Sequence, residues 1–179
     1  MHHNLDSFST RLFQLAVAAG CGERDELDEE QRVAAAMARQ GVGQPRWVGW
    51  QGEQVQTSIW KAPVDGAVRV GSTNLDGDQQ SDLSVHGGPN KAVYAYPSEH
   101  YAFWQAEAER VFRQPVTLLP GAMGENLTTE ALFERELWVG DRLRIGEVML
   151  QVTEPRQPCF KFAALLGYPA AVRHMLQSG

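Results

Sequence analysis

Residues Arg142-Leu-Arg-Ile-Gly-Glu-Val-Met-Leu-Gln-Val-Thr153 give the clearest indication of the fold class of this chain. Two short runs, 142–145 and 148–153, carry aliphatic residues at alternate places, and Gly146-Glu147 lies between them. Alternating runs joined by a two-residue turn that begins with Gly are typical of a β-hairpin. The sequence therefore predicts two antiparallel strands here.

Further strands and helices are expected on the N- and C-terminal sides of this hairpin. Runs at 55–60, 67–70, 116–119 and 137–139 also fit strands, and Gly140-Asp141 supplies another turn. Ser98 is expected to cap a helix that buries Tyr101 and Trp104, and two more helices are expected at 160–166 and 169–178. Many short strands with interposed helices predict an α+β fold, mainly β, of β-barrel type, over residues 41–179.

Residues 1–40 differ in character from the rest of the chain. They contain no Pro, and two segments, 8–19 and 26–40, fit helices; the second has an acidic start and a late Arg39, which complement a helix dipole. We therefore expect a helical N-terminal extension over residues 1–40. The apolar stretch before Cys21 also resembles a lipoprotein export signal loosely, but Asp6 and Gln14 weaken that alternative.

Composition excludes several classes of protein. Across 179 residues, 16 Lys+Arg stand against 22 Asp+Glu, a net charge of −6, which does not suit a non-specific nucleic-acid binder. No apolar run approaches the roughly 20 residues of a membrane span. Two cysteines, Cys21 and Cys159, do not make a disulfide scaffold. We expect a cytoplasmic protein that binds neither nucleic acid nor membrane.

Cys159 lies in the segment Pro155-Arg-Gln-Pro-Cys-Phe-Lys161. Arg156, Lys161 and the start of the helix expected just beyond it favour a thiolate, which is a nucleophile and a ligand for soft metals. The alternative is a structural thiol, because free cysteines are commonly buried.

Two other polar clusters follow expected strands. In His86-Gly87-Gly88-Pro-Asn-Lys91, the histidine suits a general acid or base, the glycines allow backbone amides to approach an anion, and the lysine suits a phosphate. A turn histidine satisfied by backbone groups is the alternative. Glu125-Asn126 suits a loop that binds the edge of a heterocycle, or an Asx-type turn.

Other metal and nucleotide motifs are weak or missing. Asp76, Asp78 and Asp82 lack the glycine and terminal glutamate of an EF-hand, so a solvated loop is expected. No paired Cys or His residues complete a zinc site around Cys159 and His86, and neither a Walker A motif nor a dinucleotide fingerprint occurs.

In their order along the chain, these clusters resemble the MOSC domain (molybdenum cofactor sulfurase C-terminal domain), and its YiiM-like members in particular. The matching segments are Thr57-Ser-Ile-Trp-Lys61, Asn74-Leu-Asp-Gly-Asp78, Val85-His-Gly-Gly-Pro-Asn-Lys-Ala-Val-Tyr94, Tyr96-Pro-Ser-Glu-His-Tyr101, Gly124-Glu-Asn-Leu-Thr128, Gly140-Asp141 and Pro155-Arg-Gln-Pro-Cys159. They cover roughly three quarters of the chain, from about Gly41 onward.

The resemblance implies a barrel-like domain that binds the molybdenum cofactor (molybdopterin), with Cys159 as the protein's ligand to molybdenum. It implies that Lys91, Arg156, Lys161 and the backbone at Gly87-Gly88 hold the pterin and its phosphate, and that Glu125 and Asn126 line the pocket. The implied reaction is reduction of N-hydroxylated compounds, such as hydroxylaminopurines and amidoximes, to amines. His86 or Glu125 would supply protons, and a separate reductase would supply electrons; a homodimer stays open.

Two other functions stay open beside this oxidoreductase. One is a cofactor carrier or sulfur-relay module that uses Cys159 without reducing a substrate. The other is a hydrolase in which Cys159 attacks, His86 is the base and Glu125 orients the imidazole.

The chain also departs from the family pattern. Helical residues are expected at 33–39, where relatives have their first strand, and relatives continue past Gly179, so the closing strands of the barrel are expected to be missing.

Overall fold

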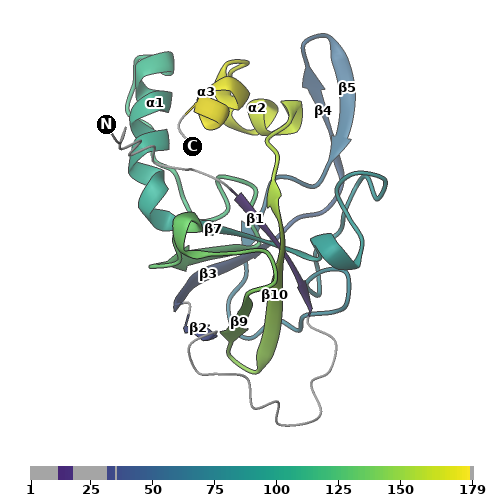
Figure 1. Cartoon of the computed structure of the whole chain (residues 1–179). Helices are drawn as coiled ribbons and strands as arrows, with labels where there is room; N and C mark the ends of the chain where they lie inside the picture. Colours follow the sequence, from purple (N-terminus) through teal and green to yellow (C-terminus); the bar gives the residue numbers. More distant parts are fainter. Residues whose placement is uncertain (1–11, 18–31, 35, 178–179) are drawn as a thin grey trace, which may run out of the picture.

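The computed structural model of the chain describes residues 12–17, 32–34 and 36–177 (Figure 1). It is a mixed α+β structure with more sheet than helix. The sheet strands are β1 (Leu12–Val17), β2 (Arg32–Ala34), β3 (Ala36–Val42), β6 (Ala62–Pro63), β7 (Val93–Pro97), β8 (Leu127–Glu130), β9 (Arg142–Ile145) and β10 (Val148–Arg156). A separate hairpin consists of β4 (Arg46–Trp50) and β5 (Glu53–Thr57). The helices are α1 (Tyr101–Phe112), α2 (Phe160–Leu166) and α3 (Ala171–Gln177), with 3-10 turns η2 (Pro89–Lys91), η3 (Ser98–His100) and η4 (Glu134–Glu136).

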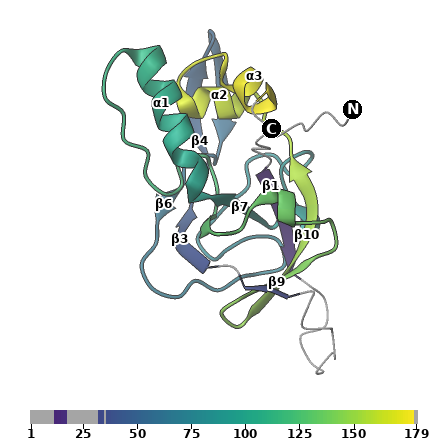
Figure 2. The same cartoon turned by 60° about the vertical axis from the view of Figure 1, so that its left-hand side comes forward.

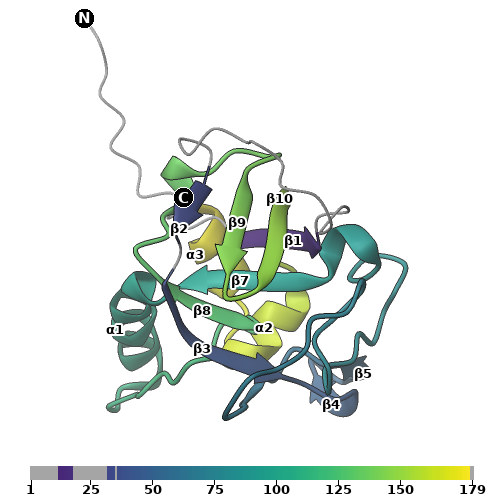
Figure 3. The same ribbon diagram turned by 90° about the horizontal axis from the view of Figure 1, so that it is seen from below.

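The main sheet has the strand order β2-β9-β10-β1-β7-β8-β3-β6. β2 and β3 are one residue apart along the chain but lie near opposite ends of this order. β2 is the first strand and pairs with β9, whereas β3 is the second-last strand and pairs with β8. The sheet must therefore curl back toward itself, and Figure 3 shows β9 and β10 on one side of β1 and β7, and β8 and β3 on the other. Among the described residues the strand order does not return to its first strand, so a closed barrel stays a prediction.

The prediction of helices in residues 1–40 is wrong for those of these residues that the structure describes. Residues 12–17 form β1, and residues 32–34 and 36–42 form β2 and β3. β1 pairs with β10 on one side and β7 on the other, and Leu15 is completely buried. Partners on both sides outweigh the helix propensity of alanine-rich segments, because propensity is a weak preference. The remaining residues of both predicted helices lie outside the described part of the chain.

Helical residues were expected at 33–39, so that the first strand of the family pattern would be lost or replaced, but residues 36–42 form β3 in that place. Three other predicted strands are also wrong. Residue Val70 forms only an isolated bridge with Leu75, residues 116–119 form an irregular segment, and residues 137–139 follow η4 without pairing. Ser98 starts η3 and does not cap α1, whose N-cap is His100.

The C-terminal predictions are confirmed. The hairpin of β9 and β10 forms with its turn at Gly146, and α2 ends at Gly167, which adopts a positive φ of 81°. The run predicted at 55–60 overlaps β5, which ends at Thr57. Strands β4, β7 and β8 were not predicted as such.

Two apolar cores lie on opposite sides of the central strands. One packs the helices against the sheet around Tyr96, Trp104 and Phe162, and the indole nitrogen of Trp104 donates a hydrogen bond to the Tyr96 hydroxyl at 2.7 Å. The other surrounds Leu15 and Leu150. Figure 2 shows all three helices gathered at one end of the sheet. None of the helices described is long and apolar enough to cross a membrane.

Candidate functional site

A pocket that is open to solvent lies where β10 passes into α2. Its wall is formed by Thr57 at the end of β5, Ser58, Ile59 and Lys61, residues 78–82, His86, Lys91, Tyr94 on β7, Gly124 and Asn126 before β8, and Arg156 and Lys161. These segments are far apart in sequence, and the sheet brings them together because β7 and β10 both flank β1.

The pocket is rich in positive charge although the whole chain is acidic. The chain has three lysines, Lys61, Lys91 and Lys161, and all three line the pocket together with Arg156. Each lysine has a carboxylate partner: the Nζ atoms of Lys61, Lys91 and Lys161 lie 2.6, 2.9 and 3.7 Å from oxygens of Asp78, Glu154 and Asp82.

Arg156 differs from these lysines, because it has no carboxylate partner within the described part of the chain. Its guanidinium carbon lies 4.2 Å from the centre of the Tyr94 ring, a cation–π contact. The hydroxyl of Tyr94 is buried and accepts or donates no hydrogen bond within the described structure. A cation and a buried hydroxyl without polar partners fit a pocket that takes an anionic, polar ligand.

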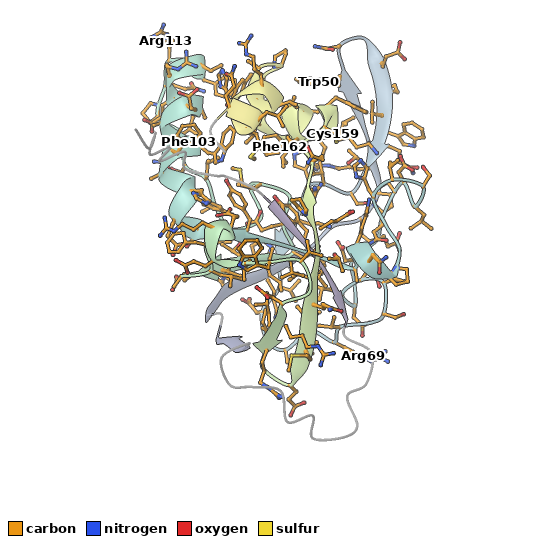
Figure 4. All side chains as sticks on the ribbon, viewed as in Figure 1. Trp50, Arg69, Phe103, Arg113, Cys159 and Phe162 are labelled. Carbon is orange, nitrogen blue, oxygen red and sulfur yellow. The ribbon has the colours of Figure 1, made fainter. Side chains whose placement is uncertain are left out.

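Cys159 lies beside His86 at the edge of this pocket. Cys159 is the N-cap residue of α2 and is half-buried, and its Sγ lies 3.7 Å from Nε2 of His86. Figure 4 shows Cys159 at the junction of β10 with α2. Burial, followed by the charges of Arg156 and Lys161, lowers the pKa of His86, so the imidazole is mainly neutral at pH 7.

Asp78 and Lys61 form a buried ion pair in the pocket wall. Asp78 accepts hydrogen bonds from Lys61 Nζ at 2.6 Å, from the Gly43 amide at 2.7 Å and from Asn126 Nδ2 at 3.0 Å. Burial lowers the pKa of Lys61, although Asp78 opposes that shift. The side-chain amide of Asn126 also accepts from the backbone of Tyr94 and donates to Gly41. Asn126 therefore lines the pocket and ties its wall together.

Glu125 is not brought into the pocket. It is 1% exposed, and its carboxylate accepts hydrogen bonds from the amides of Gly121 and Met123 and from the hydroxyls of Tyr101 and Thr128. Burial raises its pKa, and these hydrogen bonds offset part of the effect. Glu125 is held in the interior by these donors, whereas the adjacent Asn126 lines the pocket.

Gly87 and Gly88 shape the turn before η2 and are not part of the pocket lining. The Gly88 amide donates to Gln80 Oε1 at 3.3 Å, and Gly88 has a φ of 92°, which disfavours other residues. A Cβ at Gly87 would lie 2.5 Å from the same Gln80 oxygen. The glycines thus let His86 and Lys91 reach the pocket.

Of the predicted site residues, the structure brings together Cys159, His86, Lys91, Asn126, Arg156 and Lys161. Sequence reasoning missed Lys61 and Tyr94 as site residues and treated Asp78 only as a weak cation ligand. The low number of lysines was a usable signal in the sequence. The chain has three lysines, and the structure places all three at this pocket.

Comparison with known proteins identifies the family to which the chain belongs. The MOSC domain matches residues 82–179. YflK of Bacillus subtilis (strain 168), an uncharacterized protein, is 41% identical over 138 residues, which is 77% of this chain and 60% of YflK. YiiM of Escherichia coli (strain K12) is 41% identical over 105 residues, 59% of this chain and 46% of YiiM. A protein named "Reductase" from Gibberella moniliformis is 35% identical over 132 residues, which is 73% of this chain and 23% of that protein.

Among solved structures, the crystal structure of YiiM from Geobacillus stearothermophilus superposes with a TM-score of 0.57 at 32% identity, over 81% of this chain and 63% of that one. The chain thus spans only part of the length of these relatives. The family match covers more than half of the chain and includes the segment from His86 to Cys159. The chain therefore belongs to the MOSC domain family, as a YiiM-like member of it.

Proposed function

We propose that this protein binds the molybdenum cofactor in the pocket, with Cys159 as the protein's ligand to molybdenum, and reduces N-hydroxylated compounds to amines. The observation that carries the proposal is the Cys159 thiol at the edge of a cationic pocket, 3.7 Å from a neutral His86. Two comparisons support the proposal in a more general way: the chain belongs to the MOSC domain family, and one of its relatives is named as a reductase.

The donor set at the site fits such a cofactor. Among the described residues, no group of three or more His, Cys, Asp and Glu side chains could enclose a metal ion. A metal bound to Cys159 therefore needs most of its ligands from a cofactor, which is what the sulfur atoms of molybdopterin offer. A single thiolate is also the soft ligand that such a metal prefers.

The charges of the pocket fit the phosphate of the cofactor. Arg156 is the pocket cation that has no carboxylate partner in the described structure, so we assign the phosphate to it first. Lys91 and Lys161 lie on the same wall, but each already pairs with a carboxylate. The buried Tyr94 hydroxyl offers a further hydrogen bond to the bound group.

Within this proposal, the bound cofactor supplies the two-electron reduction of the substrate. The residues of the chain bind and orient. Neutral His86 accepts the thiol proton of Cys159 when the sulfur becomes a ligand. A separate reductase supplies electrons, and a reducing compartment such as the cytoplasm keeps the thiol available.

The test is elemental analysis for molybdenum, together with reduction of a hydroxylamine by the protein and a reduced dye. We expect the wild type to carry molybdenum and Cys159→Ser to lose it, while Cys21→Ser, the same substitution at the other cysteine, retains it. Molybdenum without turnover would favour the cofactor carrier or sulfur relay instead. A wild-type protein that takes up no molybdenum overturns the proposal.

The hydrolase alternative has less support. The contact of Cys159 with His86 suits a nucleophile and its base, but the buried Glu125 is held by other donors and is not seen to contact the imidazole. Covalent trapping of an acyl probe at Cys159 in metal-free protein would revive that alternative.

A further inference from the structure

Lysine and arginine are used differently in this chain. It has three lysines and thirteen arginines, and the lysines all line the pocket, whereas Arg156 is the one arginine in the pocket lining described here. Both residues carry a positive charge, but only lysine changes its protonation state within the range in which proteins work. A lysine in this pocket can therefore supply a proton where an arginine cannot.

Lys61 is the lysine best placed for this role. Its side chain is 8% exposed, and it reaches the pocket from the segment between β5 and β6. The one hydrogen bond described for Nζ goes to Asp78, which the Gly43 amide and Asn126 hold from two other segments. An ammonium group has three donors, so Lys61 has donors left for a ligand in the pocket.

The charged groups that act on Lys61 come from three segments. Two carboxylates favour the protonated form of the Lys61 amine: Asp78, in the loop after β6, and Glu125, just before β8. Arg156, at the end of β10, disfavours that form. Burial has the largest effect, and the pKa of Lys61 falls below its ordinary value of 10.5. A lysine whose pKa is lowered toward the working pH is a more effective general acid than an ordinary lysine.

We propose that Lys61 donates the proton that releases the substrate oxygen as water, and that Asp78 is the positioning residue for Lys61. This inference rests on the proposed function. In the reaction R–NH–OH + 2 e⁻ + 2 H⁺ → R–NH₂ + H₂O, the N–O bond breaks, and the two electrons originate from the separate reductase. The departing hydroxyl takes one proton from Lys61 and becomes water. The nitrogen takes the second proton from solvent, which then also reprotonates Lys61.

The first test uses Lys61→Arg, which keeps the charge and the partnership with Asp78 but does not release a proton in the working range. We expect kcat for the hydroxylamine to fall roughly 100-fold or more, the usual contribution of a general acid, with KM unchanged. In the wild type, kcat should fall on the alkaline side as Lys61 loses its proton, and this limb should vanish in the variant. Molybdenum content and thermal unfolding serve as controls for cofactor binding and folding.

A second readout does not depend on turnover. Because the chain has three lysines, ¹³Cε NMR of lysine-labelled protein gives three side-chain signals, and Lys61→Arg identifies one of them. We expect the Lys61 signal to titrate below the ordinary lysine pKa of 10.5, and Asp78→Asn to move both this titration and the alkaline limb of kcat to lower pH. If Lys61 and Asp78 had only a structural role, Asp78→Asn would leave the alkaline limb of kcat at the same pH.

The outcomes separate the two proposals. If wild-type protein with molybdenum does not reduce the hydroxylamine, the proposed function and the role of Lys61 both fall. If the wild type reduces it and Lys61→Arg keeps the same kcat and pH profile, only the role of Lys61 falls. A Lys61 signal that titrates at or above 10.5 also overturns that role.

Discussion

The Sγ atom of Cys159 lies 3.7 Å from Nε2 of His86, although 73 residues separate them in the sequence. His86 lies in the loop that precedes η2, and Cys159 ends the irregular segment after β10. Their contact places the thiol at the edge of a pocket that holds every lysine of the chain.

Arg156→Gln should weaken binding of the cofactor. Arg156 has no carboxylate partner in the described structure, so its donors are available to the phosphate. A hydrogen bond to a charged group contributes about 1.5–3 kcal/mol, which corresponds to roughly 10- to 100-fold in affinity. Retention of pterin fluorescence during dialysis measures the effect.

The matched control is Arg110→Gln, because Arg110 lies on α1, is exposed and pairs only with the neighbouring Glu107 in the described contacts. Equal loss of pterin from both variants would mean that general charge, and not the position of Arg156, determines binding.

Asp78→Ala should destabilise the fold strongly. It leaves the buried Lys61 without its carboxylate and leaves the Gly43 amide without an acceptor. Removing one partner of a buried ion pair costs about 3–5 kcal/mol. Urea unfolding of the purified protein measures the change. Asp65→Ala is the control, since Asp65 is 95% exposed in its pair with Arg39 and exposed pairs contribute little; similar losses for both would show that the Lys61 pair is not buried in solution.

The stability of the protein should fall as the pH rises above the ordinary pKa of Glu125. Burial raises this pKa above 4.5, so the folded state keeps a proton that the unfolded chain has already released. The unfolded state then binds fewer protons, and the free energy of unfolding decreases with pH until the folded carboxyl also ionises. Urea midpoints between about pH 4 and 7 measure the slope.

Glu125→Gln removes the titrating group, so this part of the slope should disappear in the variant. Its stability should also be lower at every pH, because one of its side-chain N–H groups would face the amide of Gly121 or Met123, which are donors. An unchanged slope in the variant would assign the pH dependence to other groups.

Leu15→Ala should cost about 2–5 kcal/mol of stability, the usual effect of truncating a buried leucine. Leu15 is 0% exposed in the centre of the sheet, between β10 and β7. Leu176→Ala on α3 is the control, because Leu176 is 58% exposed. Thermal or urea unfolding compares them. If Leu15→Ala were as mild as the control, β1 would not be part of the core, and the predicted N-terminal helix would regain support.

Local signals explain which elements were predictable from the sequence. The β9–β10 hairpin, α1 and α2 are formed by contacts between residues near one another in the chain, so turn residues and apolar spacing were sufficient to predict them. β1 and β3 depend on distant partners, and β1 pairs with residues 150–156. Their alanine and leucine content favours helices locally, and only the distant partners make them strands.

The candidate site shows the same division. Cys159, His86 and Arg156 were found because Pro or Gly residues mark their segments in the sequence, although Arg156 is the last residue of β10. Tyr94 lies inside a buried strand and reads as an ordinary core residue. Glu125 and Asn126 are adjacent, and the sequence does not say which of the two side chains turns toward the pocket, because that depends on how the strand beside them packs.

The register of β1 on β10 places Leu12 opposite Arg156, so the first described strand supports the backbone of the pocket cation that has no carboxylate partner among the described residues. During synthesis, this strand can pair with β7 once residues 93–97 have been made, but its partner on the other side, β10, follows only at residues 148–156. The thiol and its surroundings therefore assemble only after β10 has been made, and Cys159 cannot hold a cofactor in this pocket before that point.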